Sequence, residues 1–292
     1  MIKVDFTVID GSSAVRVAIT GSRGQLGSAL QHVLAEPAVL GLVRPEHDVT
    51  NISAIKTAIQ DFIPDLVIHA AAMTDVDGCE RNPEAAQRIN ALGTRNVAVA
   101  AQQVGAKLVY ISTDYVFDGS KGEPYWEYDD VNPLSVYGRT KWLGEEMVRR
   151  FSSRYYIVRT AWLYGEGEGN FVGTVLRLAE EHESLQMVTD EVGSPTFVLD
   201  LARAVIELVG TSAYGTYHLS NAGTCSRYQW TREILDLAGY DRIRLVPGQN
   251  YERLAPVPKK VALENVCAAE LGITMRPWRD ALRARFASDH SR

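Results

Sequence analysis

Residues 15–27 read VRVAITGSRGQLG, an apolar run rich in β-branched residues that passes directly into a loop containing Gly21, Gly24 and Gly27. The run predicts a buried strand, and the segment GQLGSALQHVLA predicts an amphipathic helix after it. Glycines at such a turn let the backbone approach a pyrophosphate, which the free amides at the start of the helix would bind. The stretch therefore predicts the first unit of a dinucleotide-binding fold, although the same glycines also suit a plain tight turn.

The alternation of strand and helix continues along the chain. Apolar segments that predict strands lie at 38–43, 65–71, 107–113 and 155–165, and helical patterns lie between them at 53–62, 82–105 and 137–150. Continuous apolar strands that alternate with helices indicate a parallel sheet covered on both faces. Right-handed crossovers make such a sheet doubly wound, with ligands at the C-terminal ends of its strands. We therefore expect an α/β protein with a doubly wound, Rossmann-like parallel sheet.

The alternation weakens after Gly165, and this change suggests a division of the chain. We expect an N-terminal extension at 1–14, a dinucleotide-binding domain at 15–165 with 196–221 returning to it, and a smaller C-terminal substrate-binding lobe at 166–195 and 222–290. In the extension, VDFTVID predicts an extra edge strand to which we assign no function. In the lobe, Ser226 and Gln229 have the spacing of a capping box at the start of a helix.

The composition argues against several classes of function. The 292 residues carry a formal net charge of -6 and no run of Lys or Arg, which argues against nucleic acid as a partner. No apolar stretch is long enough to span a membrane, and a signal-peptide pattern is absent, so we expect no membrane contact. Three scattered cysteines without a CxxC pair indicate reduced thiols in a cytoplasmic protein. The six histidines show no ligand spacing, so we expect no metal site, while the role of magnesium stays open.

The end of the second strand bears on the choice of cofactor. An NAD site usually has a carboxylate there to hold the ribose 2′-hydroxyl. Here the strand ends LGLVRPEHD, which places Arg44 at that point, and Arg23 lies inside the glycine loop. Planar guanidinium groups suit a 2′-phosphate. The pair therefore favours NADPH, whereas two exposed surface arginines are the alternative and leave NADH open.

Residues 137–141 read YGRTK, which puts Tyr137 and Lys141 one turn apart on the same face of the expected helix. The preceding strand KLVYIST ends with Thr113 at the rim of the sheet, where ligands bind. A free phenol has a pKa of about 10, so a nearby ammonium would help it to exchange a proton near neutral pH. A hydroxyl beside it would hold the oxygen of a carbonyl. Together they predict a carbonyl-reducing site, although a Tyr and a Lys at this spacing also suit a surface pair.

Further motifs extend over nearly the whole chain, from Val15 to about Phe286. They are GSRGQLG, AAAMTDVDGCE, NALGTRN, STDYVFDG, YGRTK and RTAWLYG. With these motifs the sequence resembles the extended short-chain dehydrogenase/reductase family. The strings STDYVFDG, GSPTFVLDLA and LGITMRPWRDAL are more specific, and resemble the members that reduce the 4-keto group of a nucleotide-activated 6-deoxyhexose with NAD(P)H. The resemblance implies dTDP-4-dehydro-β-L-rhamnose as the substrate and dTDP-L-rhamnose as the product.

The resemblance also implies roles for five residues near the reacting carbon. It makes Tyr137 the proton donor, Lys141 its helper and a ligand of the nicotinamide ribose, and Thr113 the hydroxyl that binds the carbonyl. Asp114 would lie beside the sugar, and Trp162 along the substrate pocket. By residue type alone, Asp114 could instead cap a turn, and Trp162 could belong to the core.

The expected cofactor contacts run from the glycine loop to the end of the third strand. They are Gly21, Arg23, Gly24, Gln25, Leu26, Gly27, Arg44, Asp48, Val49, Ala70, Ala71 and Ala72, besides Tyr137 and Lys141. By resemblance, the three residues after Arg23 would line the pyrophosphate. Asp48 and Val49 would meet the adenine, and the three alanines would lie along the cofactor.

Related functions of the same fold need different residue types. Sugar-nucleotide 4,6-dehydratases have a second acid after the Thr-Asp pair, whereas Tyr115 follows Asp114 here, which argues against dehydration. A nucleotide-sugar 4-epimerase uses the same Tyr and Lys and stays open. A non-catalytic regulatory role also stays open, because the fold resembles the regulatory subunit of methionine adenosyltransferase as well.

One segment departs from the family pattern. The family usually has Arg-Pro near the start of its C-terminal segment, where this chain reads APVPKKVAL and Val257 replaces the arginine. Lys259 and Lys260 follow, and either could meet a diphosphate as a point charge. The sugar or the nucleotide could therefore differ from the family norm. A homodimer is a further alternative that these residues leave open.

Overall fold

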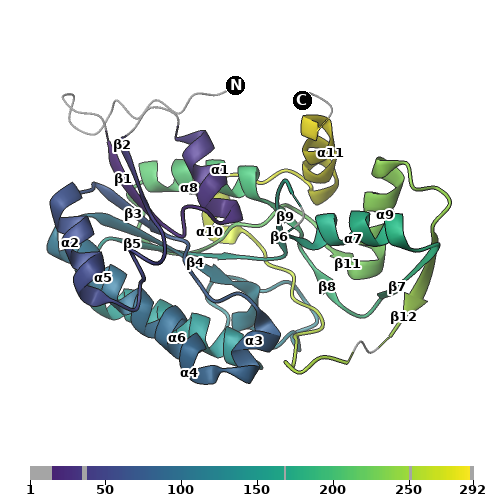
Figure 1. The fold of residues 1–292 in the computed structure, drawn as a ribbon, viewed down its shortest axis with the longest axis horizontal. Helices are drawn as coiled ribbons and strands as arrows, with labels where there is room; N and C mark the ends of the chain where they lie inside the picture. Colours follow the sequence, from purple (N-terminus) through teal and green to yellow (C-terminus); the bar gives the residue numbers. More distant parts are fainter. Residues whose placement is uncertain (1–14, 35–37, 168, 250–251, 290–292) are drawn as a thin grey trace.

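The computed structural model describes residues 15–34, 38–167, 169–249 and 252–289. The extension at 1–14, with the edge strand expected there, lies outside the described residues. The main sheet has six parallel strands in the order β10–β5–β4–β3–β1–β2 (Figure 1). In chain order these strands are β1 (Arg16–Thr20), β2 (Ala38–Leu42), β3 (Leu66–His69), β4 (Lys107–Thr113), β5 (Tyr155–Thr160) and β10 (Gly215–His218).

Alternate residues of each strand feed two separate cores. Val17 and Ile19 of β1 are fully buried against one set of helices, whereas Ala18 between them is buried against another. The first set contains α1 (Gln25–Val33) and α8 (Val198–Gly210), and the second contains α2 (Ile52–Phe62), α5 (Thr94–Gln103) and α6 (Val136–Phe151). The two sets cover opposite faces of the sheet (Figure 1). The structure thus confirms the doubly wound, Rossmann-like fold, since apolar strands buried on both faces require helices on both sides.

The connection between β3 and β4 differs from the single helix expected at 82–105. It contains α3 (Val76–Arg81), α4 (Pro83–Gln87), a π-helical turn at Arg88–Gly93 and then α5. Asn90 in the π turn accepts from the Met73 amide at 2.8 Å, and its side-chain amide donates to the Met73 carbonyl at 3.1 Å. It also donates to Thr140 Oγ1 at 3.1 Å. Asn90 therefore ties the loop after β3 to α6 and has a structural role.

The part of the molecule farthest from β2 consists mainly of C-terminal segments (Figure 1). Its helices are α7 (Phe171–Glu181), α9 (Arg227–Ala238) and α11 (Trp278–Asp289), whereas α10 (Val266–Glu270) packs against β10 of the main sheet. Short strands pair locally as β6–β9 (Leu163–Tyr164 with Thr196–Phe197), β8–β11 (Val192–Gly193 with Cys225–Ser226) and β7–β12 (Ser184–Val188 with Arg244–Gly248). The capping box is confirmed, since Ser226 and Gln229 bond each other's backbone amides at the start of α9. We refer to α7, α9 and the strands β7, β8, β11 and β12 as the lobe.

Two of the more specific sequence motifs meet at one ion pair. Arg276 of the closing motif donates to Asp200 of α8 through Nε at 2.7 Å and through Nη2 at 2.6 Å. Asn221 donates to the same carboxylate at 2.9 Å and to the Arg276 carbonyl at 3.1 Å. These residues therefore hold the C-terminal segment on α8. No described helix combines the length and the apolar character needed to cross a membrane.

Candidate active site

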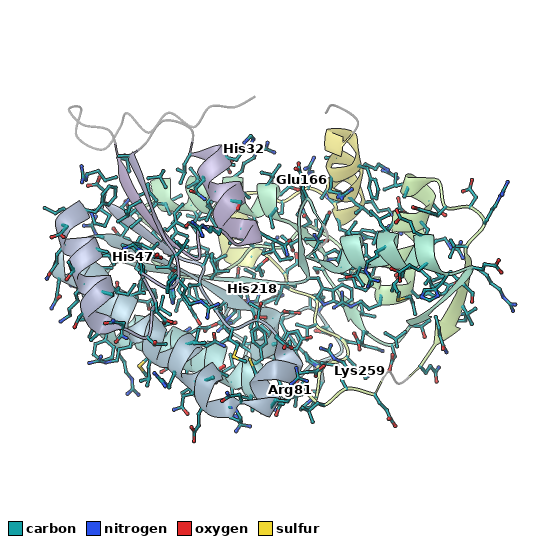
Figure 2. All side chains as sticks on the ribbon, viewed as in Figure 1. His32, His47, Arg81, Glu166, His218 and Lys259 are labelled. Carbon is teal, nitrogen blue, oxygen red and sulfur yellow. The ribbon has the colours of Figure 1, made fainter. Side chains whose placement is uncertain are left out.

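A cleft of about 660 Å³ lies at the C-terminal ends of β1, β2, β3, β4 and β5. The structure brings every predicted site residue to its lining: Gly21, Arg23, Gly24, Gln25, Leu26, Gly27, Arg44, Asp48, Val49, Ala70, Ala71, Ala72, Thr113, Asp114, Tyr137, Lys141 and Trp162. Neither Lys259 nor Lys260 is among the described residues that line the cleft. Lys259 instead forms an ion pair with Asp190 at 2.9 Å, and Figure 2 shows it at the lower edge of the view, on the segment that follows β12.

The turn from β1 into α1 forms one end of the cleft. Gly21 has φ +68°, and a Cβ there would lie 2.9 Å from the Ala71 backbone, so only glycine lets the two loops approach so closely. The first turn of α1 has no side-chain cap, because Gly24 occupies the N-cap position. Its amides are therefore available to an anion in the cleft. These features fit a dinucleotide pyrophosphate.

The exposed side chains of Arg23 and Arg44 line this same end. Asp48 beside them accepts from the amide and the hydroxyl of Thr50, both at 2.8 Å. The hydrogen bond from the Thr50 amide, together with the charges of nearby arginines, holds the pKa of Asp48 below its ordinary value. The carboxylate is therefore charged at neutral pH. The end of the cleft that contains β2 therefore offers two guanidinium groups and a fixed carboxylate.

A buried histidine supports the loop after β3. His69 Nδ1 lies 2.7 Å from Thr20 Oγ1, and its Nε2 lies 3.0 Å from Thr94 Oγ1. Thr94 donates its own proton to the Asn90 carbonyl at 2.7 Å, so Nε2 carries the imidazole proton. Burial lowers the pKa of His69 to about 3 and keeps the ring neutral. His69 is thus a structural residue at the end of β3.

Tyr137 and Lys141 occupy the first turns of α6. Ser135 caps this helix by accepting from the Gly138 amide at 3.1 Å, which fixes the helix start and places the two side chains on the cleft side. The Lys141 ammonium donates to the Ile111 carbonyl at 2.6 Å and lies 4.3 Å from the centroid of the Tyr110 ring. Burial lowers the pKa of Lys141 to about 7. Lys141 is therefore only partly charged at neutral pH.

The pKa of Tyr137 moves in the direction opposite to our expectation. Burial raises it above the ordinary value of 10, and hydrogen bonding with Thr113 only partly opposes the rise. We expected Lys141 to bring the phenol toward neutrality. Desolvation dominates instead, because it disfavours the phenolate, and it also lowers the pKa of Lys141, so that the lysine is less charged. Tyr137 consequently keeps its proton at neutral pH.

Thr113 and Asp114 end β4 beside the phenol. Thr113 Oγ1 donates to Asp114 Oδ1 at 3.0 Å and accepts from the Tyr115 amide at 3.2 Å. Burial raises the pKa of Asp114 to about 6. The Tyr115 ring packs edge-on against Tyr137, with 5.3 Å between the ring centroids. The site thus contains the hydroxyl groups of Thr113 and Tyr137 and the carboxyl group of Asp114, whose pKa is raised.

A buried ionic network lies behind this group. Glu145 of α6 accepts from Ser112 at 2.6 Å, from Arg159 of β5 at 2.9 and 2.8 Å, and from Arg149 at 2.9 Å. Burial works to raise the pKa of Glu145, but Arg159, Ser112 and Arg149 together outweigh it and hold the pKa below the ordinary value. The network joins β4 and α6, which carry Thr113 and Tyr137, to β5, whose C-terminal end leads into Trp162. Breaking such a pair leaves an uncompensated buried charge, so it fixes their relative position.

The lobe side of the cleft contains a residue that the sequence did not indicate. Arg227, the first residue of α9, places its guanidinium carbon 3.6 Å from the centroid of the Trp162 ring. Trp162 itself has φ +45°, a conformation that is strained for a bulky residue and that clusters at functional sites. Only the capping box at Ser226 could have placed Arg227 at a helix start. Nothing in the sequence places that helix against Trp162.

The doubly wound sheet, the glycine loop after β1, and a Tyr and Lys on α6 facing a Thr at the end of β4 define an extended short-chain dehydrogenase/reductase. Within this class, the chain belongs to the family described as RmlD substrate binding domain, which matches residues 15–290.

Several relatives and solved structures are similar to this chain over nearly their whole length. A dTDP-4-dehydrorhamnose reductase structure from Bacillus anthracis in complex with NADP is 41% identical with a TM-score of 0.92, over 94% of this chain and 100% of that chain. The Mycobacterium tuberculosis dTDP-4-dehydrorhamnose reductase is 39% identical over 94% of this chain and 93% of its own length. The Bacillus subtilis spore coat polysaccharide biosynthesis protein SpsK is 39% identical, over 92% and 95% respectively.

Proposed function

We propose that this protein is an NADPH-dependent reductase of the 4-keto group of dTDP-4-dehydro-β-L-rhamnose, with dTDP-L-rhamnose as the product. The observation that carries the proposal is the meeting of the Thr113 and Tyr137 hydroxyls in a cleft whose other end is a glycine loop. The names of relatives about 39–41% identical over nearly the full chain support the choice of substrate.

The cofactor would lie between the β1–α1 turn and Lys141. The amides of α1 would hold its pyrophosphate, the loop at Ala70–Ala72 would lie along it, and Arg23 and Arg44 would hold the 2′-phosphate. The NADP complex of the Bacillus anthracis relative supports this choice over NADH. Reduced nicotinamide, bound there, supplies the hydride.

The protein's part in the reaction is to hold and deliver a proton. Tyr137 stays protonated because its pKa is raised, so its Oη can donate to the sugar oxygen as negative charge develops there. Thr113 would turn its hydroxyl from Asp114 to the same oxygen and stabilise it. Lys141 in its charged form would stabilise the phenolate that Tyr137 leaves behind. These three residues are the proposed catalytic group, with Asp114 and Trp162 beside the sugar.

The proposal is tested by following nicotinamide oxidation with dTDP-4-dehydrorhamnose generated in place, comparing NADPH with NADH. Fast consumption that yields dTDP-L-rhamnose, with a preference for NADPH, supports the reaction, the substrate and the cofactor together. Interconversion of 4-epimers without net NADPH consumption would instead indicate an epimerase. Cofactor binding without turnover of any 4-keto sugar nucleotide, with capture of a protein partner, would indicate the regulatory alternative.

Location and assembly are further parts of the proposal. A cytoplasmic location fits the three free cysteines, none of which forms a disulfide. A homodimer is proposed without a defined interface, and sedimentation of the purified protein over a range of concentrations tests it.

A further inference from the structure

Arg227 has a guanidinium group that protein contacts satisfy only in part. Its side chain is 17% exposed, and its nearest carboxylate is Glu191, at 3.6 Å between Nε and Oε2. No described residue accepts a hydrogen bond of 3.5 Å or less from this guanidinium, whereas the Arg159 guanidinium makes three. A guanidinium has five N–H donors in a planar fork. Most of the donors of Arg227 are therefore free for a ligand.

The surroundings of Arg227 fix the direction in which these donors can act. One face of the guanidinium is covered by Trp162, at 3.6 Å, with Phe171 at 4.8 Å and Trp230 at 5.7 Å. At the base of the side chain, the Arg227 amide donates to the Glu191 carbonyl at 3.1 Å. Stacking on aromatic rings holds a guanidinium in place without using its N–H groups. The group is thus fixed in orientation while it lines the cleft.

The charge of Arg227 reaches the reacting end of the cleft. Burial raises the pKa values of Asp114 and Tyr115, and the positive charge of Arg227 partly opposes both shifts. Four residues of the described lining carry Lys or Arg side chains, and they are spread along its length: Arg23 and Arg44 near β2, Lys141 at the centre, and Arg227 from the lobe. An anion bound beyond the catalytic hydroxyls, on the side away from the cofactor, therefore meets Arg227.

Two other basic side chains of this region lie outside the cleft lining. Lys259 pairs with Asp190 at 2.9 Å, whereas Arg253, 3.7 Å from Asp77, is close enough for its charge to act on Tyr115 and Arg227. Neither of them is among the described residues that line the cleft, and the same holds for Val257. Among the described lining residues, Arg227 is thus the basic group that the lobe supplies.

We infer that Arg227 binds the diphosphate of the nucleotide-sugar substrate through its free N–H groups, while Trp162 and Glu191 hold the guanidinium in place. The inference rests on the function proposed above and adds to it the residue that recognises the diphosphate. A planar fork can engage two phosphate oxygens at once, which a lysine cannot do. Arg227 would therefore act on substrate affinity and leave the proton transfer at Tyr137 to the catalytic group.

The test is calorimetric binding of dTDP and of NADPH to the wild-type protein and to Arg227→Gln, Arg227→Lys and Arg177→Gln. Arg177 is a half-exposed arginine of α7 outside the cleft, paired with Glu181, and serves as the matched control. Loss of charge-assisted bonds should weaken dTDP binding by about 10- to 100-fold in Arg227→Gln, with NADPH binding unchanged. Arg227→Lys should recover part of the loss. In turnover, KM for the sugar nucleotide should rise while kcat changes by less than about 3-fold.

The outcomes separate this inference from the proposed function. If Arg227→Gln binds dTDP as the wild type does while the wild type reduces dTDP-4-dehydrorhamnose, the role of Arg227 is wrong and the function stands. If the wild type fails on that sugar but binds UDP or GDP in a manner that depends on Arg227, the substrate is wrong and the inference stands. Absence of binding of dTDP, UDP and GDP to the wild type overturns the inference. Should Arg227→Gln fail to fold, Arg227→Lys decides between these outcomes.

Discussion

Burial acts on Tyr137 and Lys141 in opposite senses, because desolvation penalises whichever form is charged. It raises the pKa of the phenol above 10 and lowers that of the ammonium to about 7. At neutral pH the pair is therefore a protonated phenol beside a partly charged amine. This state suits a reductase, which must release a proton to the substrate oxygen, better than a dehydrogenase that begins by removing one. The hydrogen bond to the Ile111 carbonyl holds the Lys141 side chain in place whether its amine is charged or neutral.

Replacement of Tyr137 by Phe tests this assignment at the level of one atom. Tyr137→Phe removes the proton donor and keeps the ring, so we expect kcat to fall by on the order of 10²-fold or more while NADPH binding stays nearly intact. The measurement is steady-state NADPH oxidation with saturating dTDP-4-dehydrorhamnose. Tyr128→Phe is the matched control, because Tyr128 is 67% exposed and lies outside the cleft lining. A kcat of Tyr137→Phe within a few-fold of the wild type would show that another group donates the proton.

At the scale of the elements, the short strands around residues 192–197 hold Trp162 in position. The Thr196 amide donates to the Trp162 carbonyl at 3.2 Å, and the Trp162 ring lies directly on Gly193. A Cβ at Gly193 would lie 2.5 Å from the ring, closer than real Cβ contacts allow. This contact explains a glycine in the motif GSPTFVLDLA. It also shows that a motif recognised by resemblance can act through the position of another side chain.

The variant Gly193→Ala should displace the Trp162 ring and, with it, the aromatic surface under Arg227. Overpacking of this kind costs about 1–3 kcal/mol, so we expect folding to survive while kcat/KM for the sugar nucleotide falls by about 10-fold or more. NADPH affinity should stay within about 2-fold, because the glycine loop is at the other end of the cleft. The control is Gly210→Ala at the end of α8, where a Cβ meets nothing within 4 Å. Equal losses in both variants would contradict the role of Gly193.

For the molecule as a whole, the parts that could be predicted from the sequence are those governed by local patterns. Local neighbours in the chain determine the periodicity of strands and helices, the turn at Gly21 and the capping box at Ser226. The parallel sheet follows from the alternation of strands with helices. The convergence of Thr113, Tyr137 and the glycine loop could be predicted because parallel strands bring their C-terminal ends to one edge.

The remaining features depend on contacts between distant segments. Arg227 reaches Trp162 only because β11 pairs with β8, a pairing of two residues on each side with no sequence signal. The π turn at Arg88–Gly93 accompanies bonds from Asn90 to Met73 and Thr140, which lie in other elements. The rise in the pKa of Tyr137 depends on how deeply α6 buries the hydroxyl. Sequence spacing predicts which residues meet but not how well water is excluded from them.

Two buried histidines connect the whole fold to pH. His69 lies under the loop after β3, and His218 lies near the middle of the molecule (Figure 2). Burial lowers the pKa of both to about 3, and for His218 the charge of Arg159 acts in the same direction. In the unfolded chain a histidine has a pKa of about 6.5. Between pH 6.5 and 3 the unfolded state therefore binds more protons, so the free energy of unfolding falls as the pH falls.

We accordingly expect acid to destabilise the protein well before its carboxylates titrate in bulk. At pH 5 each histidine should contribute a loss of about 2 kcal/mol relative to pH 7.5. Asp114 acts in the opposite sense: its pKa is raised to about 6, so its protonation favours the folded state as the pH falls. This contribution is the same in all the variants compared. Urea unfolding at the two pH values measures the loss, and His69→Gln or His218→Gln should each reduce it by about 2 kcal/mol, whatever their stability at pH 7.5. The control is His32→Gln, at an exposed position in the last turn of α1. An unchanged pH dependence in both buried variants would mean that charging these rings does not drive acid unfolding.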